Sequence, residues 1–218
     1  MCVFHSFIKT AVKILKDTNI PIAAVSAGFP HGLNPFKNRV EEIENSVKDG
    51  AKEIDIVINR SYVFSSDWEG LYNEIKIFKR ACGDAHLKTI IGTGELGTLK
   101  NVAKASLVCM MAGADFIKTS TGKEKTNATL PVSLIMLRMI RDFKEKTDLT
   151  IGFKPAGGIK TAKQSLEWMI LVKEELGNNW LEPEFFRFGA SGLLTDIERQ
   201  LEYFVTGRYS SIYSQPIG

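Results

Sequence analysis

The sequence predicts an α/β protein built as a (β/α) barrel of the TIM-barrel type, with a doubly wound open sheet as the alternative. Short runs of β-branched and aromatic residues alternate with amphipathic segments of about ten to fifteen residues, which is typical of strand–helix units and a parallel sheet. The loops rich in glycine or reactive side chains follow strands, as in barrels whose sites form at the C-terminal ends of the strands. With 218 residues and 44% hydrophobic content, we expect one domain over residues 1–218.

Seven strands are expected, each followed by a helix, if the short apolar stretch at the N-terminus is counted. The strands fall at residues 1–4, 21–25, 53–58, 87–91, around 116–118, 151–154 and 186–191. The helices fall at about residues 7–17, 37–48, 68–82, 98–111, 131–146, 161–176 and 194–205. Hydrophobic residues recur at helical spacing in the second set and are consecutive or alternate in the first.

Two lysines occupy strand positions that normally exclude charge. Lys118 follows Phe116 and Ile117 in a short buried strand, and Lys154 follows Phe153 in another. Burial disfavours an ammonium ion and lowers the pKa of a lysine, so a buried lysine can be a neutral amine that attacks a carbonyl. The alternative is that Lys118 keeps its head group in water. A second lysine in the same setting, also ahead of a glycine loop, favours Schiff-base chemistry.

One acidic side chain is predicted to share the interior with these lysines. Asp55 alternates with Ile54 and Ile56 in its strand, and therefore lies on the face opposite the apolar one. A carboxylate inside a barrel needs a cationic partner, and the two lysines are the available ones. Asp55 is therefore expected beside the two lysines whether it serves as a structural ion-pair partner or as part of a catalytic site. Lys88 is a candidate third interior lysine, with an electrostatic or structural role.

Glycine-rich loops follow the last three expected strands. Glycine lets backbone N–H groups approach an anion, and a phosphate site formed after the final strands is usual in this fold. We therefore predict that these loops bind a phosphate, the alternative being that the glycines serve tight turns only. The candidate residues are Thr121, Gly122, Lys123, Gly157, Gly158, Gly189 and Ser191.

Other kinds of site are disfavoured. Gly92-x-Gly94-x-x-Gly97 has the spacing of a dinucleotide fingerprint, but the acidic residue needed at the end of the next strand is lacking, because Asp115 stands at the start of that strand. The three histidines and three cysteines show no metal-ligand spacing. We expect no metal and no other cofactor.

Charge and composition limit the partners. A net charge of +3 with 24% charged residues is too mild to argue for nucleic acid and suits a small anionic ligand. We recognise no signal peptide and no apolar run long enough to span a bilayer, and the odd number of scattered cysteines fits free thiols in a reducing compartment. We expect a cytoplasmic protein that binds neither nucleic acid nor membrane.

Together these motifs resemble the deoxyribose-phosphate aldolases, a family of class I aldolases, over nearly the whole chain. The resemblance implies a (β/α)8 barrel that reversibly cleaves 2-deoxy-D-ribose 5-phosphate to D-glyceraldehyde 3-phosphate and acetaldehyde without a cofactor. It also implies that Lys118 forms the imine, Lys154 keeps Lys118 neutral, Asp55 shuttles protons through water and the glycine loops hold the phosphate. It rests on residues 116–123, 152–158, 53–57 and 188–191.

The sequence departs from the family pattern in two places. Gly192 stands where the family usually has a hydroxyl residue, which removes one phosphate contact. The family's first strand and the start of its second have no counterpart here, and Cys2 matches the middle of that second strand. We therefore expect a barrel that lacks its first β/α unit. We also expect marginal stability or aggregation, unless a partner strand fills the gap, the two edges close into a smaller barrel, or the protein begins further upstream.

Two other functions stay open from sequence alone. Another barrel enzyme acting on a sugar phosphate, such as an epimerase or a different Schiff-base aldolase, shares the phosphate loops. A non-catalytic binding or scaffold protein derived from such a barrel shares the pocket without turnover. Borohydride separates an imine enzyme from an epimerase, because it reduces the imine irreversibly. Sugar phosphates and aldehydes are the expected ligands. The chain is also a candidate for assembly into a homo-oligomer.

Overall fold

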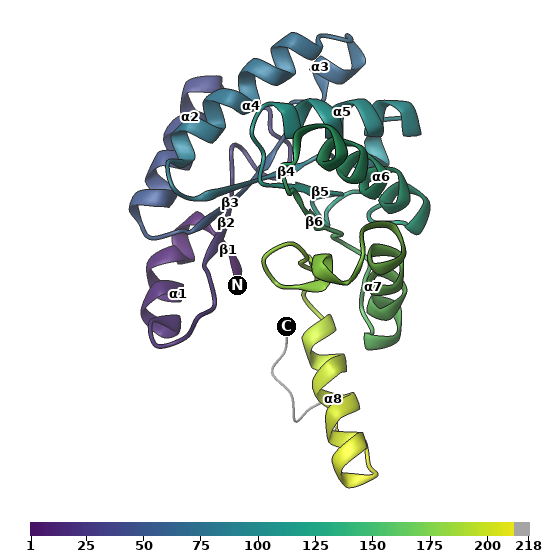
Figure 1. Ribbon diagram of the computed structural model, residues 1–218. Coiled ribbons are helices and arrows are strands. Elements are labelled where there is room, and N and C mark those ends of the chain that lie inside the picture. Colours follow the sequence, from purple (N-terminus) through teal and green to yellow (C-terminus); the bar gives the residue numbers. More distant parts are fainter. Residues whose placement is uncertain (212–218) are drawn as a thin grey trace.

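The computed structural model describes residues 1–211, in which six strands form one parallel sheet (Figure 1). The strands are β1 (Cys2–Phe4), β2 (Ala23–Ser26), β3 (Glu53–Val57), β4 (His86–Ile90), β5 (Phe116–Lys118) and β6 (Gly152–Lys154). They follow one another across the sheet in sequence order. A doubly wound sheet reverses its strand order at a switch point. The sequential order therefore favours the barrel type of winding over the alternative.

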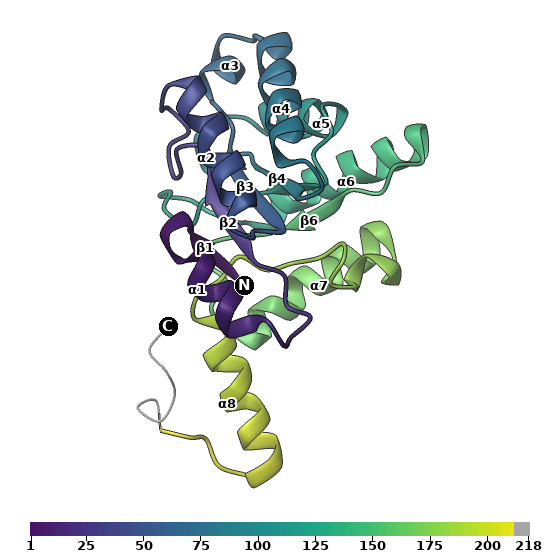
Figure 2. The same cartoon turned by 90° about the vertical axis from the view of Figure 1, so that its left-hand side faces the viewer.

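Helices follow the strands and lie around the outside of the sheet, except that α8 extends away from it in both views (Figures 1 and 2). The α-helices are α1 (Ile8–Leu15), α2 (Phe36–Lys48), α3 (Ser61–Phe64), α4 (Trp68–Cys82), α5 (Leu99–Met111), α6 (Leu130–Thr147), α7 (Ala162–Leu176) and α8 (Leu193–Thr206). Short 3-10 turns are η1 (His5–Phe7), η2 (Thr93–Glu95) and η3 (Asn178–Leu181). The sequence predicted all of these α-helices except α3, and none of the 3-10 turns.

Threonine side chains begin the three helices that follow β4, β5 and β6. Each accepts a hydrogen bond from the third amide of its helix, and loss of such a cap typically costs ~1 kcal/mol. These caps hold one end of the loops that leave the C-terminal ends of the strands. The pairs are Thr98 with Asn101 (3.1 Å), Thr129 with Val132 (3.5 Å) and Thr161 with Gln164 (3.1 Å).

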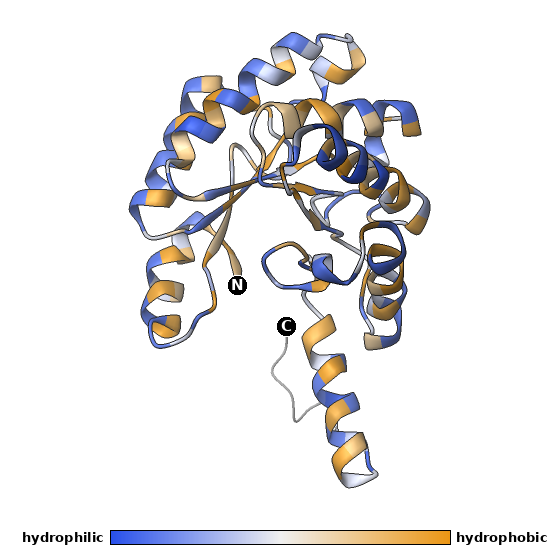
Figure 3. Cartoon of the chain, in the orientation of Figure 1, coloured by the Kyte–Doolittle hydropathy of each residue, from blue (hydrophilic) through white to orange (hydrophobic). Residues whose placement is uncertain are grey.

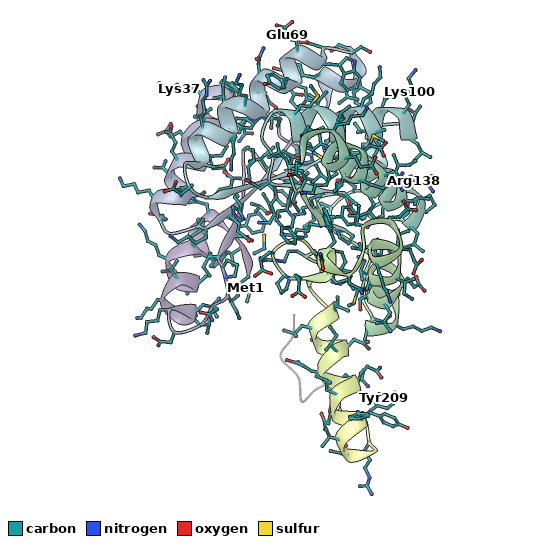
Figure 4. All side chains as sticks on the ribbon, viewed as in Figure 1. Met1, Lys37, Glu69, Lys100, Arg138 and Tyr209 are labelled. Atoms are coloured by element: carbon teal, nitrogen blue, oxygen red, sulfur yellow. The ribbon has the colours of Figure 1, made fainter. Side chains whose placement is uncertain are left out.

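The apolar core lies between the sheet and its helices, as the orange strands and helix faces show (Figure 3). Ile54, Ile56 and Ile58 are fully buried in it, which confirms the face predicted for them. Charged side chains such as Lys37 and Lys100 point outward from the helices (Figure 4). The opposite face of β3 carries the buried side chains of Glu53 and Asp55, together with Val57.

A buried ion pair joins α2 to α4. Arg39 Nη1 lies 2.5 Å from Glu74 Oε1, and the two side chains are 3% and 2% exposed. Arg39 also donates to the carbonyl groups of Ala27 (3.2 Å), just after β2, and Val57 (3.3 Å), the last residue of β3. Glu74 accepts in addition from the Asn59 amide (3.3 Å). The guanidinium and the carboxylate therefore neutralise each other, and backbone groups complete their hydrogen bonds.

The seventh strand, expected at residues 186–191, is not a regular strand. The segment makes only isolated parallel bridges to the chain around β6, although the Arg187 amide still donates to the Phe153 carbonyl (3.2 Å). Within residues 1–211 no strand pairs with the edge of this segment that faces away from β6. The segment therefore has a hydrogen-bonding partner on one side only. The bridges are Phe153 with Phe186 and Ala156 with Gly189.

One apolar cluster extends from Ile8 in α1 to Leu193 in α8. The single domain over residues 1–218 stays a prediction, and residues 212–218 lie outside the described part of the chain. Among the helices that the structure describes, none combines the length and apolarity required to cross a bilayer.

Candidate active site

Asp55 lies at the centre of a buried cluster on the inner face of the sheet. Its Oδ2 accepts hydrogen bonds from Lys118 Nζ (2.8 Å) and Lys154 Nζ (2.7 Å). Asp55 is 0% exposed and the two lysines are 4% and 5% exposed. Lys118 on β5 pairs in register with Lys154 on β6, while Asp55 on β3 pairs with Lys88 on β4. The structure therefore brings together the three side chains that the sequence singled out for catalysis.

A second carboxylate lies on the same face of β3. Glu53 Oε2 is 2.7 Å from Lys88 Nζ, and Glu53 Oε1 is 3.2 Å from Arg187 Nη2. Lys88 is 0% exposed, so the prediction of a third interior lysine is confirmed. Its Nζ lies 3.9 Å from Asp55 Oδ1 and 5.0 Å from the centroid of the Phe116 ring. The two carboxylates thus belong to one charged interior.

Three further residues of the cluster, Glu53, Arg187 and Cys2, were not predicted from sequence as members of the site. Glu53 precedes Asp55 by two residues, and this spacing in a strand was a signal that both share a face. Cys2 Sγ, at the start of β1, lies 4.0 Å from Asp55 Oδ2. No local pattern marks Arg187 as a partner of Glu53, because the two are 134 positions apart.

The charges of the cluster set its pKa values. Burial disfavours the Asp55 carboxylate, but the ammonium groups of Lys118, Lys154 and Lys88 outweigh it and hold the pKa of Asp55 well below its ordinary value. Burial also opposes the Lys154 ammonium, yet Asp55 prevails and raises the pKa of Lys154. For Lys88 burial prevails over Asp55 and Glu53, and its pKa is lowered. Lys154 therefore retains its proton beside Lys118.

Two of the glycine loops lie against each other. Gly122 (φ +82°), Gly157 (φ +81°) and Gly158 (φ +85°) all have left-handed backbone conformations that L side chains rarely adopt. A Cβ on Gly122 would lie 4.0 Å from the Gly157 Cα, which places the loops after β5 and β6 side by side. These loops lie directly beyond Lys118 and Lys154 in the chain.

The backbone amides of the predicted phosphate residues differ in availability. The Gly157 amide donates to the Gly189 carbonyl (2.9 Å) and the Gly189 amide to the Pro155 carbonyl (2.8 Å), so both already have partners. In the described part of the chain, the amides of Gly122, Gly158 and Ser191 donate to no protein group. An anion at this place would find three free donors.

The rest of the loop after β5 is braced by an acidic side chain that was not foreseen. Glu124 Oε1 accepts from the Thr121 amide (2.8 Å) and from Thr121 Oγ1 (3.2 Å), and the Lys123 amide donates to Thr121 Oγ1 (3.1 Å). Burial raises the pKa of Glu124. Lys123 is exposed beside this turn, where its ammonium is free to meet an anion.

Residues 1–211 contain no group of three or more His, Cys, Asp or Glu that could hold a metal ion.

A model of the DeoC/LacD family aldolases matches residues 5–194 of the chain. The chain belongs to this family. Deoxyribose-phosphate aldolase from Homo sapiens is 61% identical to this DeoC/LacD family member over 219 residues, which are 100% of this chain and 69% of the human protein. The resemblance on which the sequence analysis relied is confirmed.

Solved structures of aldolases share the fold of this DeoC/LacD family member. A putative deoxyribose-phosphate aldolase from Toxoplasma gondii ME49 superposes with a TM-score of 0.81 at 22% identity, over 97% of this chain and 82% of that one. A deoxyribose phosphate aldolase from Aeropyrum pernix, described as a tetramer, gives a TM-score of 0.71 at 20% identity, over 95% and 77%. At these identities they support the parallel α/β fold alone.

Proposed function

We propose that the chain is a class I aldolase that cleaves 2-deoxy-D-ribose 5-phosphate reversibly to D-glyceraldehyde 3-phosphate and acetaldehyde. The observation that carries this proposal is the pair of buried lysines, Lys118 and Lys154, which share one carboxylate oxygen of Asp55. The high identity to proteins with this name supports the choice of substrate.

Imine formation is the first step. Lys118 Nζ attacks the aldehyde carbon C1 of the open-chain sugar phosphate as a free amine, and loss of water from the resulting carbinolamine gives a protonated imine. Lys154 and Lys118 both bind Asp55 Oδ2 and so lie close together. The protonated Lys154 favours the free amine at Lys118, because two neighbouring ammonium groups repel each other.

Cleavage follows because the imine accepts electrons. A base takes the proton of the C3 hydroxyl, the C2–C3 bond breaks and its electron pair moves through C2 toward the iminium nitrogen. Glyceraldehyde 3-phosphate departs and leaves an enamine on Lys118. The enamine takes a proton at C2, and hydrolysis of the new imine releases acetaldehyde. Because its pKa is low, Asp55 holds no proton itself and acts by orienting a water that transfers it.

The phosphate binds at the glycine loops. The free amides of Gly122, Gly158 and Ser191 supply donors, and Lys123 supplies positive charge. Helix α8 begins directly after Gly192, which provides no side-chain cap. Its first amides are therefore available to an anion, in line with the preference of phosphate for helix N-termini.

The test is reductive trapping of the imine. Protein treated with acetaldehyde and borohydride should gain an N-ethyl group on Lys118, located by peptide mass spectrometry, and should lose retro-aldol activity irreversibly. Protein treated with borohydride alone is the control. A modification confined to surface lysines, with activity retained, would contradict the proposal and favour an epimerase. Saturable sugar-phosphate binding without turnover would favour a binding protein.

Assembly and location are separate proposals. We propose a homo-oligomer, and light scattering on the purified protein would measure its mass. The Aeropyrum pernix aldolase is described as a tetramer, which motivates this measurement. A cytoplasmic location also stays a prediction, which cell fractionation would test.

A further inference from the structure

The buried interior of the sheet contains more basic groups than acidic ones. Two carboxylates face four basic side chains, which is an excess of two positive charges if all are ionised. The groups that face this interior are Cys2 from β1, Glu53 and Asp55 from β3, Lys88 from β4, Lys118 from β5, Lys154 from β6 and Arg187 from the segment beside β6, with the Met1 amino group at the edge.

Excess positive charge inside a protein favours loss of a proton from one of the amines. Arg187 cannot supply that proton, because a guanidinium stays charged in proteins. The excess therefore acts on the three lysines, and each carboxylate reduces it. Asp55 belongs to the reacting cluster, so Glu53 is the carboxylate left to set the background charge.

The geometry around Glu53 separates Lys88 from Asp55. Lys88 Nζ is 2.7 Å from Glu53 but 3.9 Å from Asp55 Oδ1. Among the described residues, Asp55 Oδ1 has no hydrogen-bond donor. Lys88 would become that donor if Glu53 released it. The pairing with Glu53 thus leaves Asp55 Oδ2 to Lys118 and Lys154.

Arg187 fixes Glu53 from the opposite side of the interior. Its Nη2 lies 3.2 Å and its Nη1 lies 3.4 Å from the Glu53 carboxylate. The Arg187 backbone is in turn held by Phe153, one residue before Lys154. Glu53 is therefore bound between β4 and the chain beside β6, and both of its oxygens are occupied.

We propose that Glu53 is a positioning residue of the aldolase reaction, which holds Lys88 away from Asp55 and sets the pH above which Lys118 is a free amine. This inference rests on the proposed function. Removing the Glu53 charge makes every ammonium in the interior less favourable, so the free amine persists to lower pH.

The test compares pH–rate profiles of retro-aldol turnover. Glu53→Gln should move the acid limb of kcat to lower pH by about one unit, the size of shift typical of a nearby charge. Lys88→Met removes a positive charge and should move the limb to higher pH. The double variant should return it close to the wild-type position. If Glu53→Gln fails to fold, Lys88→Met alone still tests the charge balance.

The matched control is Glu175→Gln. Glu175 also bridges two cations, Arg138 (3.4 Å) and Arg141 (3.0 Å), but on the outer helices α6 and α7. The same substitution there should leave the acid limb in place. Equal losses of kcat at every pH in Glu53→Gln and Lys88→Met, with the limb unmoved, would overturn the proposal in favour of a structural role.

A second readout separates this proposal from the function on which it rests. The rate at which acetic anhydride acetylates Lys118, followed by peptide mass spectrometry against pH, reports the free amine without any turnover. A wild-type protein that fails to form the borohydride adduct refutes the aldolase function. The acetylation profile of Glu53→Gln still tests Glu53 in that case, and an unshifted profile refutes its role.

Discussion

The Arg39–Glu74 pair and the cluster around Asp55 are both buried, but they differ in charge balance. In the first, one guanidinium faces one carboxylate, and backbone groups meet the remaining bonding capacity of both. In the second, Lys118 and Lys154 compete for a single oxygen of Asp55. In the balanced pair each charge has one opposite charge as its partner. An unbalanced cluster gives up a proton readily, which is what an amine nucleophile requires.

The two clusters also lie in different parts of the fold. Arg39 binds the carbonyl groups of Ala27, just after β2, and Val57, the last residue of β3, and so ties α2 to the sheet. The Asp55 cluster lies on the inner face and joins β3 to β5 and β6. Loss of the first should therefore reduce stability, and loss of the second should reduce activity.

The largest expected effect is on the nucleophile. Lys118→Leu or Lys118→Arg should lower kcat by roughly 10⁴-fold or more, since neither side chain forms an imine. The measurement is coupled detection of glyceraldehyde 3-phosphate. Lys146→Leu, on the exposed surface of α6, is the control and should keep full activity. Appreciable turnover by Lys118→Leu would place the imine on another amine.

Breaking the balanced pair should lower stability instead. Arg39→Met leaves Glu74 as an uncompensated buried charge, which typically costs about 3–5 kcal/mol. Urea unfolding would measure the loss. The double variant Arg39→Met with Glu74→Leu should recover most of it, because no buried charge is left. If the double variant is as unstable as the single one, packing rather than charge explains the pair.

Removing the neighbouring cation should lower activity less than removing the nucleophile. Lys154→Leu should reduce kcat at neutral pH by roughly 10²–10³-fold and move the acid limb of the profile to higher pH, because the repulsion that favours the free amine is lost. Lys154→Arg keeps the charge and should keep the limb in place. Coincident acid limbs for Lys154→Leu and the wild type would rule out charge as the reason for Lys154.

The smallest effect concerns stability in acid. The pKa of Asp55 is depressed in the folded state, so its contribution is full above its unfolded pKa of about 3.9 and is lost as pH falls below it. Below about pH 4 the wild type should therefore lose more stability than Asp55→Asn, by ~1.4 kcal/mol per pH unit. Asp17→Asn, at an exposed carboxylate, should keep the wild-type slope. Urea unfolding at several pH values provides the measurement.

The parts of the fold that depend on local pattern were predictable from sequence. The spacing of two between Ile54, Ile56 and Ile58 identified the core face of β3, and it placed Asp55 on the opposite face. Lys118 was predicted inside because apolar residues precede it and glycine follows. The strand at residues 186–191 was overestimated, because a regular ladder also needs partners that local propensity does not describe.

The partners within the site were harder to predict than its members. A strand position tells which face a side chain occupies, but not which group from a distant strand meets it. The bond from Arg187 to Glu53 arises from the arrangement of the sheet. The hydrogen bonds from Thr121 to Glu124 depend on the conformation of one turn, and the single glycine of that loop, Gly122, did not indicate them.

The Phe116 ring beside Lys88 also restricts which residue can stand at Gly152. The Phe116 ring lies against the place where a Cβ on Gly152 would stand, so even a methyl group there overlaps the ring. The ring would have to move, and Lys88 Nζ lies only 5.0 Å from its centroid. The ring and the lysine beside it therefore keep their places only if the first residue of β6 is glycine, which has no functional group of its own.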